Sequence, residues 1–427
     1  MRLFLSMTLF FILFLLGLIT LKEEFILLSL PLAVYIGVAL ISIPADIDLK
    51  ISRKIEPSRF IRGDQIEVLV QIHNSGNILR EVIIEDIIPD SVTVVDGHTS
   101  LIADLCPDEH LELNYKITGK RGIHHFEGLR IVSGDPFGLF QLRMINPIEG
   151  EVRILPRSFR IKSIPIRPEV TKGYTGFFPS KVGGTGVEFF NVREYQPGDA
   201  MNTINWSASA RSYDRLFSNE YQMENTADIW LILDARRRSD FMVGVESLFE
   251  IMVEITTSVA QLLIQNGNRV GLLIFGGFLD WTYLGSGKKH REKVLAALTK
   301  AKTGESRIFN KLGNLPTRIF PPRSQIIFVS PIHSEDYVFL SSLRGRLYQV
   351  LCISPDPISF ELGRWDQEDY SELGVRIAKV ERRFLLSRLR YSGIQVLNLD
   401  SSLPIEMSLG RFPAVFFHRA NLIRSQI

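Results

Sequence analysis

The residues most suited to chemistry lie in one stretch, EFFNVREYQPGDAMNTINWSASAR, which runs from Glu188 to Arg211. It contains three carboxylates, Glu188, Glu194 and Asp199, and such a set of oxygens could hold a divalent cation for metal-dependent hydrolysis. No nucleophile, base and oxyanion donor accompany them, which weakens the hydrolase hypothesis. The preferred hypothesis is a structural or docking network in which Arg193 and Arg211 join the carboxylates through charge-assisted hydrogen bonds.

The same stretch predicts a turn followed by a short helix. Proline and Gly198 occupy the centre of QPGD at 196–199, as a type II turn requires. Asp199 is then placed to cap a helix that includes Ile204. Trp206 has a large apolar body and one hydrogen-bond donor, which suits either anchoring of that helix against a sheet or contact with a partner.

The bulk composition limits the classes of partner. The chain has 427 residues, too many for one hydrophobic core, so several domains are expected. Its 49 basic and 47 acidic side chains leave a net charge of +2, which disfavours nucleic acid as a partner. The two cysteines, Cys106 and Cys352, lie far apart in the sequence and suggest neither a disulfide framework nor a thiolate metal cluster.

Two uncharged apolar runs open the chain, Leu3 to Leu21 and Phe25 to Ile43, with only Lys22, Glu23 and Glu24 between them. Each run is long enough to cross a hydrocarbon layer of about 30 Å as a helix. Residues 1–45 are therefore predicted to form a two-span hairpin in the lipid bilayer of the cell membrane, with spans at about 3–21 and 25–43.

The flanking charges predict the orientation of this hairpin. Basic residues outside the two spans outnumber the single Lys22 of the connecting loop; they are Arg2, Lys50, Arg53 and Lys54. By the positive-inside rule, the domains after the hairpin are cytoplasmic. The opposite orientation, with those domains acting outside the cell as an adhesin, remains an alternative.

The middle of the chain alternates apolar and polar residues with period two. IEVLVQI at 66–72 and LELNYKI at 111–117 show the pattern, and turn-forming residues separate such segments. Residues 46–165 are therefore predicted to form an antiparallel β-sandwich of the immunoglobulin-like kind. His124 and His125 resemble a ligand pair, but adjacent residues on a strand point to opposite faces, so one is expected in the core and one on the surface.

The last part of the chain, residues 226–427, alternates short apolar runs with amphipathic helical segments. The runs at 229–233, 270–275 and 326–329 lack alternation, as expected of strands covered on both faces. This order predicts an α/β doubly wound, Rossmann-type domain with a mainly parallel sheet. Ligands of such folds meet the carboxyl edge of the sheet, which here includes Asp234, Ser330 and Ser354.

The chain as a whole resembles the DUF58 family, membrane-anchored proteins of bacteria and archaea with a von Willebrand factor A-like domain. The most specific part of the resemblance is the stretch from Glu188 to Arg211, within a motif segment predicted at residues 166–225. The matching positions there are Glu188, Phe189, Arg193, Tyr195, Gly198, Asp199, Ile204, Trp206, Ala210 and Arg211. Asn202 departs from the pattern, because the family usually has arginine at that place.

The resemblance also raises the question of a metal. Domains of the von Willebrand A type often hold Mg²⁺ through Asp-x-Ser-x-Ser after the first strand. Asp234 is present here, but Arg236 and Arg238 occupy the two serine positions. Guanidinium groups offer no lone pair and oppose a divalent cation, so we predict a degenerate site without metal. The run of three arginines, Arg236 to Arg238, is expected to be either a solvated loop or a docking point for an anionic partner.

These observations favour a membrane-anchored protein-interaction scaffold with no catalytic residue and no cofactor. The family resemblance implies cooperation with a MoxR-type AAA+ ATPase, which would hydrolyse the ATP, in assembling or remodelling other proteins. The metal-dependent hydrolase and the extracellular adhesin remain the alternatives.

Overall fold

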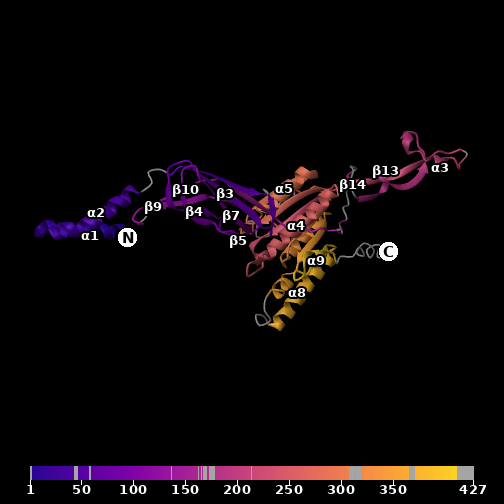
Figure 1. Cartoon of the computed structure of the whole chain (residues 1–427). Helices are drawn as coiled ribbons and strands as arrows, with labels where there is room; N and C mark the ends of the chain where they lie inside the picture. The colour runs from indigo at the N-terminus through magenta and orange to yellow at the C-terminus, as the bar shows by residue number, and fades with distance from the viewer. Residues whose placement is uncertain are drawn as a thin grey trace. The chain divides into compact units, whose positions relative to one another are not determined.

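The computed structural model divides the chain into two compact units, residues 1–155 and 156–427 (Figure 1). The residues that it describes are 2–42, 47–56, 59–135, 137–161, 163–164, 166, 171–172, 178–212, 214–306, 313, 319–364 and 371–410. Side chains within 171–190 and 220–225 lie outside this description.

Two long apolar helices begin the first unit, α1 (Arg2–Thr20) and α2 (Glu23–Ile41). Both are long and apolar enough to cross a membrane, and most of their side chains are exposed, which is consistent with the predicted membrane anchor. A third helix, α4 (Leu248–Gln265), also passes this test, but 72% of it is buried in the second unit. Its apolar character therefore reflects packing within the protein. The cytoplasmic orientation stays a prediction.

The rest of the first unit is built from strands. Two sheets are antiparallel and four-stranded, in the orders β1-β3-β7-β5 and β10-β9-β4-β6, and a third has the order β2-β11-β8. Their bounds are β1 Leu49–Glu56, β2 Arg59–Ile61, β3 Ile66–Asn74, β4 Leu79–Ile87, β5 Val92–Gly97, β6 Ser100–Leu105, β7 His110–Gly119, β8 Gly122–His125, β9 Gly128–Gly134, β10 Gln141–Asn146 and β11 Glu151–Leu155.

One buried cluster draws its side chains from all three sheets, among them Ile66, Ile84 and Ile154. The period-two pattern is confirmed, because alternate residues of β3 are buried. His124 is buried and bonded to Ser91 Oγ at 2.6 Å, whereas His125 is exposed, as expected for neighbours on a strand.

A buried ion pair beside this cluster involves one of the basic residues from which the membrane orientation was predicted. The Arg53 guanidinium contacts the Asp86 carboxylate at 2.5 and 3.2 Å, and neither side chain is exposed. The Tyr115 hydroxyl donates to Asp86 at 2.5 Å. Burial is the main cause that raises the pKa of Tyr115, and the neighbouring Asp86 carboxylate raises it further. Arg53 therefore stabilises the packing of the strands. The orientation argument rests on the remaining basic residues, Arg2, Lys50 and Lys54.

The second unit is organised around an eight-stranded sheet whose main path is β18-β17-β14-β19-β20-β21, with β12 and β13 added on β14. All pairs along this path are parallel except β17 with β18. The strands are β12 Thr171–Lys172, β13 Phe178–Glu194, β14 Phe217–Ala235, β17 Arg269–Gly276, β18 Leu279–Gly285, β19 Gln325–Val329, β20 Gln349–Pro355 and β21 Gln395–Leu399. A small hairpin, β15 Met242–Val243 with β16 Glu246–Ser247, lies beside it in the sequence.

Helices cover both faces of this sheet. The larger helices are α4, α5 (Gly287–Lys300), α6 (Asp336–Gly345) and α8 (Glu372–Tyr391), and the shorter ones are α3 (Trp206–Ser209), α7 (Pro357–Leu362), α9 (Ile405–Gly410), η1 (Met201–Thr203) and η2 (Arg237–Ser239). Leu231 of β14 packs in a core shared with α4 and α5. Its neighbour Trp230 packs in a second core shared with α6 and α8. The mixed α/β organisation is thus confirmed, and the unalternated apolar runs are explained by burial on both faces.

Strand β14 extends well beyond the sheet. Its first part pairs antiparallel with β13 from Phe217 opposite Glu194 to Asn225 opposite Phe178, with three irregularities in register. We call this two-stranded extension, with η1 and α3 near its tip, the arm (Figure 1). The motif segment therefore lies at one end of β14, and Asp234 lies at the other.

Candidate functional site

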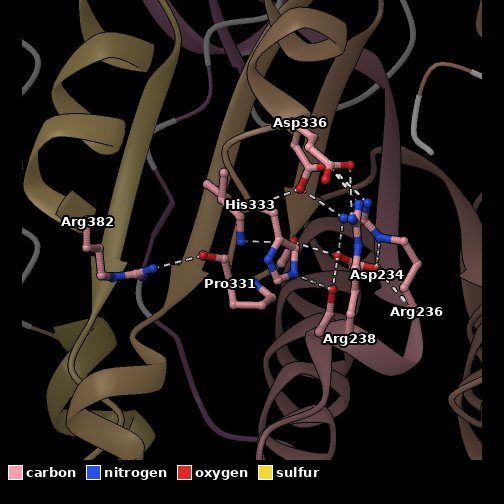
Figure 2. A network of polar contacts seen from close by, with 11 residues as sticks. Asp234, Arg236, Arg238, Pro331, His333, Asp336 and Arg382 are labelled. Carbon is pink, nitrogen blue, oxygen red and sulfur yellow. Dashed lines mark hydrogen bonds and ion pairs between the residues drawn. The ribbon is translucent and has the colours of Figure 1, made fainter. Parts of the chain in front are cut away.

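The carboxyl edge of the central sheet carries a dense polar cluster centred on Asp234 (Figure 2). Arg236, two residues further on, folds back so that its Nε and Nη2 donate to the two carboxylate oxygens at 2.8 and 2.7 Å. Hydroxyls of Ser239 and Ser330 each donate to Asp234 Oδ2 at 2.7 Å. Because β14 and β19 are neighbours, Ser330, which follows β19, reaches Asp234 directly.

The same guanidinium bridges to a second carboxylate. Nη1 and Nη2 of Arg236 each contact an oxygen of Asp336 at 2.9 Å, at the start of α6. Asp234, Arg236 and Asp336 are at most 2% exposed. One buried cation thus lies between two buried carboxylates, which lets each charge be held without water.

Electrostatics keep Asp234 and Arg236 ionised. Burial acts to raise the pKa of Asp234, but the bonds and charge of Arg236 and the two hydroxyls outweigh it and leave that pKa below its usual value. Burial likewise acts to lower the pKa of Arg236, and Asp234 with Asp336 reverses the effect and raises it. The arginine is therefore a fixed internal cation.

A histidine lies beside the pair. His333 Nε2 is 3.0 Å from the Ser239 hydroxyl, and the His333 backbone N–H donates to Asp336 at 2.9 Å. Burial lowers the pKa of His333, although the charges of Asp336 and Asp234 act against that change. Arg238 is half-buried and pairs with Glu335 at 3.0 Å and with Asp336 at 3.7 Å.

Arg382 of α8 fastens the neighbouring part of the edge. Its Nη1 donates to the Pro331 carbonyl at 2.8 Å, and its Nη2 donates to Ser354 Oγ at 3.0 Å. Its Nε lies 3.0 Å from Asp356 Oδ1. One side chain therefore ties α8 to the ends of β19 and β20, and Figure 2 shows it on the far side of Pro331 from Arg236.

These contacts bear on the predicted metal chemistry. Both oxygens of Asp234 already accept donors, and the guanidinium of Arg236 lies between the carboxylates of Asp234 and Asp336. A metal would have to displace Arg236 from two ion pairs. Among the described residues, no group of three or more His, Cys, Asp or Glu side chains is arranged to hold a metal.

The expectations for the arginine run need correction. Arg236 is neither solvated nor available to an anionic partner, because it is 2% exposed and bonded to two carboxylates. Of the predicted edge residues, the structure joins Asp234 with Ser330 and holds Ser354 through Arg382. Sequence reasoning missed Ser239, His333 and Asp336. The available signal was a polar run, HSED at 333–336, just after the strand that ends at Val329.

The arm contains a second aspartate–arginine pair. Arg193 Nη1 and Nη2 contact the two oxygens of Asp199 at 2.8 and 2.7 Å. Asp199 Oδ2 also accepts the Gln196 N–H at 2.9 Å, and these bonds, that of Arg193 above all, lower the pKa of Asp199. The Asp199 N–H donates to the Gln196 carbonyl at 3.0 Å, and Gly198 has φ +110, which confirms the predicted turn.

Two local expectations for the arm were wrong, and one of the two alternatives for Trp206 is disfavoured. Asp199 does not cap the helix; Asn205 does, by accepting the Ala208 N–H at 2.9 Å. Ile204 precedes that helix and forms a bridge with Ser218. Trp206 is 68% exposed, so it does not anchor the helix against a sheet, and the partner contact stays a prediction.

The remaining motif residues are scattered. The Tyr195 hydroxyl donates to the Asp199 carbonyl at 3.3 Å. Arg211 and Asn202 are exposed on the arm, and Arg211 does not join the Arg193–Asp199 pair. The backbones of Glu188 and Phe189 belong to β13, and their side chains lie outside the described part of the chain.

Comparison with known proteins places both polar clusters in one family region. Residues 191–337 match the family described as "Protein of unknown function DUF58". This interval includes Arg193 and Asp199 on the arm and every member of the Asp234 cluster up to Asp336. The chain is 24% identical over 277 residues to "Uncharacterized protein YeaD" of Bacillus subtilis, which covers 64% of this chain and 67% of that protein.

Two solved structures each resemble about a quarter of the chain. A FixG-related protein from Vibrio parahaemolyticus matches 25% of this chain and 95% of its own with 11% identity and a TM-score of 0.17. A β-glucosidase from Listeria innocua matches 25% of this chain and 16% of its own with 12% identity and the same TM-score, 0.17. Likeness at this level assigns no fold.

Proposed function

We propose that the protein is a membrane-anchored interaction scaffold that works without catalysis of its own. The observation that carries this proposal is the exposed Trp206 at the tip of the arm, within the family-matched region. Tryptophan is enriched among residues that dominate binding energy at protein interfaces, because it buries a large area with few rotatable bonds. The exposed Met201 extends this apolar tip.

The polar clusters support the same function. Asp199 accepts bonds from Arg193 and a backbone amide, and Asp234 accepts bonds from Arg236 and two hydroxyls. Each oxygen of the two carboxylates therefore already accepts at least one donor, with which a metal or a substrate would have to compete. Their role in this proposal is to hold the arm and the sheet edge in the shape that a partner recognises.

The proposal includes the finer assignments that the family resemblance implies. The strand-rich part is an immunoglobulin-like sandwich, and the second unit is a von Willebrand factor A-like domain. The partner is a MoxR-type AAA+ ATPase at the cytoplasmic face, and the pair assembles or remodels other proteins. The strand order β18-β17-β14-β19-β20-β21, with the break in sequence order between β14 and β19, supports the domain assignment.

Binding of the full-length chain in lipid nanodiscs to a purified MoxR-type ATPase of the same organism tests the proposal. We expect Trp206→Ala to weaken the complex by roughly tenfold or more, as for an interface hot spot. Trp281→Ala is the matched control, because Trp281 is 42% exposed on the edge strand β18, and it should bind like the parent. Absence of binding by the parent, or equal binding by both variants, contradicts the proposal.

The alternatives predict different outcomes. A metal-dependent hydrolase shows turnover that disappears in Asp199→Asn and in chelator. An extracellular adhesin is labelled by an impermeant thiol reagent in intact cells at a cysteine introduced on the surface of the second unit, whereas a cytoplasmic scaffold is not.

A further inference from the structure

One side of helix α8 is buried, and the opposite side is exposed. One side packs on the sheet through the buried Leu386 and Leu389 and is fastened by Arg382. The other side exposes five apolar residues, which we call the α8 seam: Leu373 (66% exposed), Ile377 (52%), Val380 (62%), Phe384 (70%) and Tyr391 (93%). Figure 1 shows α8 as a long gold helix at the margin of its unit.

The spacing of the seam indicates what kind of surface it fits. Successive members are separated by four, three, four and seven positions, which is the alternation of a heptad repeat, with Ser387 at the missing place. On a helix with 3.6 residues per turn, they form a stripe about 60° wide, or about 80° with Ser387, on the side opposite Leu389. Such a narrow stripe is typical of a seam between two helices, whereas a helix that lies on a bilayer buries a broader apolar face.

Basic residues border this seam. Arg376, Arg383 and Arg390 are all exposed, and each directly precedes a seam residue on the same flank of the helix. The other flank carries Glu381 and Arg388. In coiled coils, residues at these flanking positions choose the partner by charge.

A second copy of α8 is a poor partner. Parallel pairing would set Arg376 against Glu381 but also Arg383 against Arg388, so attraction and repulsion cancel. Antiparallel pairing would bring the arginine flanks of both copies together. The chain's own last residues, 411–427, are equally unsuited by charge, because they contain three arginines and no acidic residue.

We propose that the α8 seam docks an amphipathic α-helix of another protein, with apolar residues at the same alternating spacing and glutamate or aspartate on its flanks. This deepens the proposed function by naming a second surface and the kind of client or partner segment that it takes. The arm and α8 then bind different chains.

Two synthetic helical peptides test the proposal on the full-length chain in nanodiscs of zwitterionic lipid. Both have leucine at the alternating positions, and they differ only in glutamate or lysine on the flanks. Fluorescence anisotropy should show the glutamate peptide binding roughly tenfold more tightly, since several flanking ion pairs each add a small attraction. This preference should shrink as salt rises.

Variants separate the seam from its flanks. Ile377→Ser with Phe384→Ser should abolish binding, and Arg376→Glu with Arg383→Glu and Arg390→Glu should reverse the preference. Phe278→Ser is the matched control, because Phe278 is 61% exposed in the turn between β17 and β18, and it should bind like the parent. Trp206→Ala should also leave peptide binding unchanged, so failure here is distinguishable from failure of the ATPase complex.

Equal affinity for the two peptides, or normal binding by the serine variant, overturns the proposal. Dimerisation in detergent that disappears in the serine variant would assign the seam to a second copy. A blue shift of a Phe384→Trp reporter in anionic but not zwitterionic nanodiscs would assign it to the membrane surface. Either of these last two results also overturns the proposal.

Discussion

The two ends of β14 carry the same chemical device in opposite surroundings. At the arm, Arg193 grips both oxygens of Asp199 at 2.8 and 2.7 Å, and the side chains are 35% and 19% exposed. At the sheet edge, Arg236 grips both oxygens of Asp234 at 2.8 and 2.7 Å, and the side chains are 2% and 0% exposed. The bond lengths are equal, and the surroundings differ.

Burial decides what each pair does. At the buried sheet edge, removal of one charge leaves the remaining charges unpaired and away from water. The charged side chains of the cluster therefore stabilise the fold only together. At the arm, water can replace either partner, so the pair orders a turn without determining the stability of the fold. The cluster at the sheet edge therefore stabilises the fold, whereas the pair on the arm orders a turn next to the exposed Trp206.

The largest effect is expected from Arg236→Met. It leaves Asp234 and Asp336 buried without a cation, and it should lower the free energy of unfolding by about 3–5 kcal/mol. Denaturant titration of the full-length chain in detergent measures this. The triple variant with Asp234→Asn and Asp336→Asn as well should recover much of the loss, because no charge is then left unpaired. A single variant as stable as the parent would refute the importance of the buried cluster.

The second largest effect is the loss of stability at acid pH that depends on Asp234. Its pKa is below the value in the unfolded chain, about 3.9, so the unfolded state binds more protons in acid. The stability that ionised Asp234 contributes is thus fully present above about pH 4 and is lost as pH falls through the lower, folded pKa. Asp234→Asn should be less stable at pH 7 and should show a shallower decline in acid. Parallel pH profiles of the parent and the variant would argue against this account.

A smaller effect is expected near neutral pH from His333. Burial lowers its pKa below about 6.5, the usual value, so between the folded and unfolded pKa values only the unfolded chain takes up the proton. Stability should therefore fall modestly as pH drops from 7 towards 5. His333→Gln should flatten this part of the curve, which thermal unfolding at several pH values can measure. An unchanged slope would mean that other groups titrate there.

The smallest effect on stability is expected at the arm. Trp206→Ala removes a side chain that is 68% exposed, so the free energy of unfolding should change by no more than about 0.5 kcal/mol. Asp199→Asn should likewise unfold within error of the parent. Unfolding curves recorded beside the ATPase-binding assay separate loss of a contact from loss of the fold. A strongly destabilised Trp206→Ala would show that the arm is packed and not presented.

Local patterns in the sequence predicted much of this architecture. The runs that became α1 and α2 were identified by their length and apolar composition. The strands around Ile66 and Leu113 were identified by alternation, because burial on one face imposes period two. The turn at Gly198 followed from the need for positive φ. The carboxyl edge with Asp234 and Ser330 followed from the order of strands and helices.

The sequence alone therefore determined the segments, their periods and the edge on which Asp234 lies. The tertiary structure decided which cation neutralises that carboxylate, since Arg236 lies between Asp234 and Asp336, and Asp336, 100 positions away, is brought there by the fold. It also decided that Trp206 is exposed while Arg53 is buried. The physical reason is that a period depends on neighbours along the chain, whereas the partner of a charge depends on which strands lie side by side.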